Sequence, residues 1–120
     1  MKAWSGTLAF EDRETDDGRM IAAGALVWPV LPIALLDGDS RKPLGRVTEI
    51  TREGNTIRAT GEWSEDEEEI GLAIEIGSVE ADFRMAGSVM VVGGGRIFAV
   101  ATSENPSWPE ARMDPSGERA

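Results

Sequence analysis

A β-hairpin is encoded in residues 45–63, which read GRVTEITREGNTIRATGEW. From Ile57 to Trp63, apolar or small residues alternate with polar ones, which is the period of a half-buried strand. Residues 45–51 are rich in the β-formers Val, Thr and Ile, and residues 52–55 supply the Gly and Asn that turns prefer. We therefore predict two antiparallel strands here, with Trp63 in the core.

Three further regions predict strands by the same reasoning. Residues 3–10 are typical of a strand that leads into an acidic turn, and residues 78–85 alternate strictly. Residues 89–92 and 97–102 flank the triple glycine at 93–95, which predicts a second hairpin with a glycine turn. The apolar face predicted for the 78–85 strand comprises Val79, Ala81, Phe83 and Met85.

One apolar region contains prolines, which limit the structures open to it. Residues 24–36 include Pro29 and Pro32. Proline cannot donate a backbone hydrogen bond, and it interrupts both a continuous helix and a central strand. We therefore predict that the second half of this region is an extended edge or core-crossing segment.

One principal helix is expected at about residues 65–76. Ser64 and Glu67 have the spacing of a capping box, and the acids at 65–69 would lie where the helix dipole favours negative charge. Gly77 is placed to end the helix. The predicted fold class is therefore α+β and β-rich, with a small, mostly antiparallel sheet or barrel and this one helix. Its apolar stripe would comprise Ile70, Ala73 and Ile74.

The length and composition favour one acidic domain. The chain has 120 residues, of which 41% are apolar, and 12 Lys and Arg stand against 22 Asp and Glu for a net charge of −10. We predict a single globular domain over residues 1–113 and a flexible tail over 114–120. From this charge we predict no nucleic-acid partner, and we expect a cationic protein surface as the partner instead. Without an apolar run long enough to span a bilayer or a signal-peptide core, we expect no membrane association.

Two missing residue types restrict the chemistry. The sequence contains no cysteine and no histidine. Disulfides, thiolate nucleophiles and cysteine-based zinc sites are thereby excluded, as are Ser-His and Cys-His catalysis within this chain. We predict no catalytic residue, no cofactor and no metal site.

Several polar motifs have an ordinary structural explanation beside a functional one. Residues 37–40, Asp-Gly-Asp-Ser, lack the ligand spacing of a calcium loop and predict an acidic turn. Glu80 and Asp82, beside Ser78, either form a carboxylate pair or belong to a solvated strand face, and the second interpretation is favoured. An aromatic anchor for a partner is the remaining candidate site. The predicted partner-binding residues are Trp4, Pro106, Trp108 and Pro109.

The order of four short motifs resembles the prohead (capsid-maturation) protease family of tailed phages, whose fold is related to that of herpesvirus assemblin. The likeness covers roughly residues 4–113, and each motif is weak by itself. The four stretches are Trp4–Leu8 with Thr15–Arg19, Gly24–Trp28 with Leu31–Ile33, Leu44–Val47 with Gly54–Gly61, and Gly95–Ala101 with Pro106–Ala111.

The resemblance implies a serine nucleophile and a histidine base. Ser78 matches the position of the nucleophile, whereas the histidine should lie between Leu36 and Gly45, where this sequence has none. A serine without a base is a poor nucleophile. Lys42 could form a Ser-Lys dyad, but it lies in a polar loop that gives no sign of being desolvated. The resemblance therefore implies an inactive relative.

Together these points predict a virion structural protein and not an enzyme. The expected role is a capsid decoration or minor capsid protein that binds the major capsid protein and stabilises the assembled head. It would be made in the host cytoplasm and lie on the outer capsid surface, and it could associate as a trimer. One alternative is an active or assembly-stage serine protease that uses Ser78. A further alternative is an unrelated small acidic binding domain.

Overall fold

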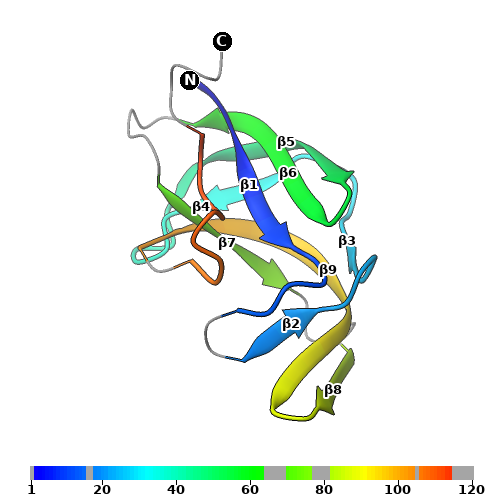
Figure 1. The fold of residues 1–120 in the computed structure, drawn as a ribbon. Coiled ribbons are helices and arrows are strands. Elements are labelled where there is room, and N and C mark those ends of the chain that lie inside the picture. Colours follow the sequence, from blue (N-terminus) through cyan, green and yellow to red (C-terminus); the bar gives the residue numbers. More distant parts are fainter. Residues whose placement is uncertain (1, 16–17, 64–69, 77–81, 105, 115–120) are drawn as a thin grey trace.

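The computed structural model describes residues 2–15, 18–63, 70–76, 82–104 and 106–114 (Figure 1). All regular structure in these ranges is β, and no helix there is long and apolar enough to cross a membrane. The strands are, in chain order, β1 (Lys2–Phe10), β2 (Arg19–Ile21), β3 (Leu26–Val27), β4 (Ile33–Leu36), β5 (Pro43–Glu53), β6 (Thr56–Trp63), β7 (Gly71–Ile76), β8 (Asp82–Ala86) and β9 (Val89–Ser103).

The predicted α+β class, with its principal helix at 65–76, is wrong. Gly71–Ile76 is strand β7, which pairs antiparallel with β9 from Gly71 opposite Ser103 to Ile76 opposite Ile97. The predicted helix cap at 64–69 lies outside the described residues. Pairing with β9 along the whole of β7 satisfies the backbone groups on one side of the strand, and tertiary context of this kind regularly overrides the weak helix preference of a short segment.

The hairpin predicted from residues 45–63 is confirmed. β5 and β6 pair antiparallel from Gly45 opposite Trp63 to Glu53 opposite Thr56. The two-residue turn begins at Gly54, whose φ of 64° is in the region that glycine adopts without strain. The indole of Trp63 is 1% exposed, as expected for the core. β1 matches the strand predicted at 3–10 and adds to β6.

These strands form a curled half-barrel. The sheet runs β1-β6-β5-β4-β9, and β7 pairs with β9 as well (Figure 1). Residues 111–114 bridge the two ends, because the N–H of Thr7 in β1 donates to Arg112 (3.0 Å) and the N–H of Leu72 in β7 donates to Ala111 (2.8 Å). The chain's last described segment therefore joins strands that are far apart in sheet order.

β4 corrects the prediction made from the prolines. It begins at Ile33, directly after Pro32, and lies between β5 on one side and β9 on the other. It is thus an extended interior strand, so the predicted edge is wrong, whereas the alternative of an extended segment through the core agrees with the buried Ile33 and Leu35. The physical reason is position: a proline just before the first strand residue removes no donor from the ladder.

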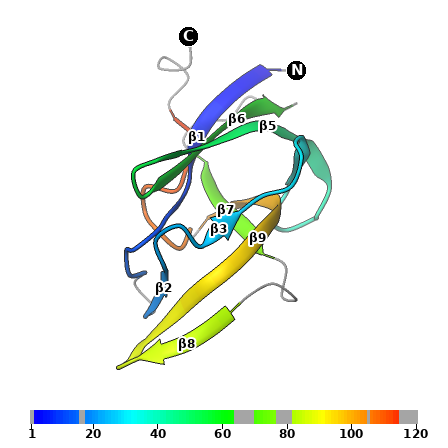
Figure 2. The ribbon, with the colours of Figure 1, turned by 90° about the vertical axis from the view of Figure 1, so that its right-hand side faces the viewer.

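β9 organises the fold, because β2, β3, β4, β7 and β8 all pair with it. The glycine turn predicted at 93–95 is wrong, since these glycines lie inside β9 and Gly93 is an extra residue opposite β8. Glycine in a strand typically marks such a bulge or bend. The hairpin turn is instead at Gly87 and Ser88, where Gly87 has a φ of 65°. The β8–β9 hairpin projects from the half-barrel, with β2 beside it (Figure 2).

The interior of the half-barrel holds the core and, among the described residues, the buried charge of Glu11. The Glu11 carboxylate has no exposed side-chain surface and accepts hydrogen bonds from Arg52 Nε (2.8 Å), Arg52 Nη2 (3.0 Å) and the Leu26 N–H (3.0 Å). Burial would raise the pKa of Glu11, but the bonds from Arg52, Leu26 and Gly24 outweigh it and hold that pKa below 4.5. The largest fully buried apolar side chains include Trp4, Leu8, Leu26, Leu35, Ile57, Trp63, Leu72 and Ile97.

Candidate functional site

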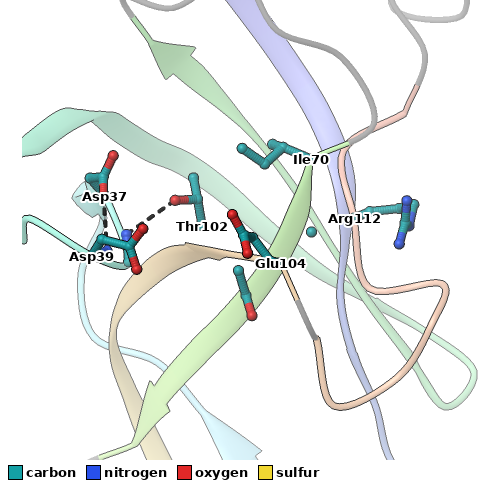
Figure 3. Close-up of a pocket in the computed structure, with 9 residues that line it drawn as sticks. Asp37, Asp39, Ile70, Thr102, Glu104 and Arg112 are labelled. Carbon is teal, nitrogen blue, oxygen red and sulfur yellow. Dashed lines mark hydrogen bonds between the residues drawn. The ribbon is translucent and has the colours of Figure 1, made fainter.

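A cleft lies where the chain leaves β4, enters β7 and ends β9 (Figure 3). It has a volume of about 620 Å³. Acidic residues come from two of these places: Asp37 and Asp39 from the loop after β4, and Glu104 from the end of β9. Further lining residues include Ile70, Thr102 and Arg112.

The acidic loop is held by its own hydrogen bonds. Asp37 Oδ1 accepts from the N–H groups of Asp39 (2.8 Å) and Ser40 (3.0 Å), and Gly38 N–H donates to Thr102 Oγ1 (3.1 Å; Figure 3). The bonds from Ser40 and Asp39 lower the pKa of Asp37 below its usual value. The turn predicted at 37–40 is therefore confirmed, and Asp37 is held as an anion that serves the turn.

A second contact ties the same loop to β7. Arg41 donates from Nη1 to Glu75 Oε2 and from Nη2 to Glu75 Oε1, both at 2.6 Å. This two-bond geometry with Arg41 lowers the pKa of Glu75. The lining described here contains no lysine, and Lys42 is exposed in the loop. The described cleft is thus a predominantly anionic surface, and its described lining contains neither histidine nor lysine.

The described residues also offer no metal centre. No group of three or more Asp, Glu, His or Cys in the described ranges lies close enough to hold a metal ion. Asp37 already accepts two backbone bonds, so its carboxylate is engaged by the protein itself. What the cleft can do chemically is to attract a cationic group from a partner.

The structure separates the predicted partner-binding residues. Trp4 and Trp108 are buried, with 1% and 4% of their surface exposed, and Trp108 Nε1 donates to the carbonyl of Arg13 (3.2 Å). Pro106 is half-buried, and Pro109 is exposed. In this conformation the two indoles belong to the core, and only Pro109 presents a large exposed surface. Partner binding at these positions stays a prediction.

The positions that belong to the protease alternative and to the carboxylate-pair alternative are described only in part. Ser78 and Glu80 lie outside the described residues, and Asp82 is the first residue of β8. Sequence reasoning identified the turn at 37–40 but missed the cleft beside it. No local signal could have found the cleft, because its walls come from separate segments at 37–39, 70–71 and 102–104, with Arg112 beside them. Only the pairing of β4 and β7 with β9 brings those walls together.

Comparison of the chain with protein-family models, with curated proteins and with solved structures finds no match. The resemblance to prohead proteases therefore stays a hypothesis based on the four sequence motifs.

Proposed function

We propose that this protein is a virion structural protein of a tailed phage, which binds the assembled head through an acidic surface and has no proteolytic role. The proposal combines the order of the four prohead-protease-like motifs with the absence of histidine from the whole sequence. The partner would be the major capsid protein, and the bound protein would stabilise the shell.

One observation supports this function over proteolysis. The resemblance places the catalytic base between Leu36 and Gly45, and in this chain that loop forms the acidic wall of the cleft. The Asp37 carboxylate accepts a hydrogen bond within its own turn, and the Arg41 guanidinium donates to Glu75. A loop built in this way presents fixed negative charge, which favours recognition of a basic surface.

The net charge of −10 fits a position outside the shell. Packaged DNA would repel such a protein, whereas basic patches between capsid subunits would attract it. Because exposed charges interact through water, binding of this kind weakens as salt is raised.

The first experiment mixes the purified protein with heads assembled without it, sediments the heads and analyses the pellet by denaturing gel. The expected result is co-sedimentation in fixed stoichiometry, with the major capsid protein unchanged in size. Protein that stays in the supernatant contradicts the proposal. A shortened capsid protein whose appearance depends on Ser78 supports the protease alternative instead.

A matched pair of variants tests the cleft itself. Asp39→Lys with Glu104→Lys reverses charge in the cleft wall, and Glu14→Lys with Glu49→Lys makes the same net change at exposed positions elsewhere. We expect the first pair to lose most head binding and the second pair to keep most of it. Equal losses of head binding by the two pairs of variants would show that binding depends on net charge and not on the cleft.

A further inference from the structure

β8 is an edge strand at the tip of the molecule. It pairs with β9 on one side, and among the described residues no strand pairs with its other side. Both views show the β8–β9 hairpin extending away from the half-barrel (Figures 1 and 2). An uncovered edge of this kind offers unpaired backbone groups to another strand.

Hydrogen bonds on the far side of β9 reveal which backbone groups of β8 point outward. The N–H of Met90 donates to the carbonyl of Gly18, and the carbonyl of Val92 accepts from the N–H of Ala22, each at 2.9 Å. In an antiparallel ladder the N–H and C=O of one residue point to the same side. Met90 and Val92 therefore direct both groups toward β2 and away from β8.

The ladder partners of these two residues must then face the uncovered edge. Met85 is opposite Met90, and Phe83 is opposite Val92. Their N–H and C=O groups are not used by β9, so four backbone groups are directed outward from β8. Residues 84–88 are all exposed, and Met85 keeps 64% of its surface in solvent.

We infer that β8 of a second copy of this chain pairs antiparallel with this edge, which forms a two-fold dimer with a continuous sheet across the two hairpins. Pairing must match outward-facing residues with one another. A register centred on Asp82 or on Arg84 sets like charges opposite each other, which is destabilising, and a register centred on Met85 sets Arg84 opposite the uncharged Ala86. The register centred on Phe83 instead sets opposite charges against each other: position 82 of each copy lies opposite Arg84 of the other copy. The two-fold axis produces this pair twice.

The projecting hairpin also makes this contact compatible with the chain's charge. Each copy carries −10, so close approach of two half-barrels is opposed. Contact at the hairpin edge keeps the bodies apart, and charges separated by more than about 8 Å are largely screened at physiological salt. The interface is small, so the dimer is expected to be weak and dependent on concentration.

Sedimentation equilibrium from micromolar to millimolar concentration tests the inference. The average mass of the unmodified protein should rise from the monomer value of 12.9 kDa toward twice that value. Arg84→Asp should raise the dissociation constant at least about tenfold, because it places like charges opposite each other at two symmetric positions. Asp82→Arg combined with Arg84→Asp should restore the dimer. Lys42→Asp makes the same net charge change outside the hairpin and should leave the dimer nearly unchanged.

A backbone variant gives an independent measurement. Met85→Pro removes an outward N–H that β9 does not use, so it should block the dimer while the circular dichroism spectrum stays that of the folded protein. The inference does not depend on a capsid partner. A protein that stays monomeric up to millimolar concentration, a mass that rises toward three chains, or a charge exchange that fails to restore pairing would each overturn it.

Discussion

Replacing Arg52 with methionine tests how the buried carboxylate of Glu11 is accommodated. Methionine keeps most of the side-chain length and removes the guanidinium, so Glu11 loses both bonds from Arg52 and keeps its backbone bond to Leu26. Arg52 also donates to the Leu26 carbonyl at 2.6 Å and lies over the Trp28 ring at 5.4 Å. The substitution therefore removes several contacts and leaves a buried charge.

The expected cost follows from that uncompensated charge. Removing one partner of a buried ion pair costs about 3–5 kcal/mol of unfolding free energy. Since the Arg52 side chain is 35% exposed, water screens part of the interaction, and we expect about 3 kcal/mol. For a chain of this length about 1 kcal/mol corresponds to about 4 °C, so the midpoint of thermal unfolding should fall by about 12 °C.

The pH dependence of the unfolding free energy shows whether the loss of stability comes from the buried Glu11 charge. In the unmodified protein the pKa of Glu11 is lowered, so its stabilisation is present above the unfolded pKa of 4.5 and is lost as pH falls through the folded pKa. Without Arg52, burial should raise the pKa of Glu11 instead. Stability of Arg52→Met should then be highest when Glu11 is protonated and fall as pH rises. The difference in unfolding free energy between Arg52→Met and the unmodified protein should be largest near pH 7 and should become smaller toward pH 5.

Urea unfolding of four proteins at pH 7 and pH 5 measures these effects. They are the unmodified chain, Arg52→Met, Glu11→Gln with Arg52→Met, and the control Arg46→Met, which breaks an exposed pair with Glu62. The double variant should be more stable than Arg52→Met at pH 7, and the control should lose less than about 1 kcal/mol. A cost for Arg52→Met below about 1 kcal/mol, or a cost that does not change with pH, would show that Arg52 does not compensate a buried Glu11 charge.

Two further predictions concern the closure of the half-barrel and the packing of β6. Asp114→Ala removes the bonds that Asp114 accepts from Arg58 at 2.6 and 3.2 Å, and urea unfolding should show a loss of about 1–2 kcal/mol, with a smaller loss for Asp114→Asn. Gly61→Ala places a Cβ against the Arg46 carbonyl and 2.8 Å from Trp4 Nε1, so we expect at least about 3 kcal/mol of destabilisation or failure to fold, measured by thermal unfolding. No change in either variant would contradict the packing described for it.

Local patterns predicted the parts of the fold that local chemistry specifies. The alternation from Ile57 to Trp63 and the Gly54 turn identified the β5–β6 hairpin, since side-chain period and turn residue both act within a few positions. The absence of histidine and cysteine restricted the chemistry without any structure, because a missing functional group cannot be supplied by folding.

Other features depended on contacts between distant residues. The sequence at 70–76 favoured a helix, but pairing with β9 made it a strand, and the glycines at 93–95 became a bulge inside β9 and not a turn. Residue patterns and composition specified the hairpin, the acidic charge and the missing functional groups. The curled sheet, the cleft and the edge of β8 that no described strand covers depend on tertiary contacts, because each arises where segments far apart in the chain satisfy, or leave unsatisfied, one another's backbone groups.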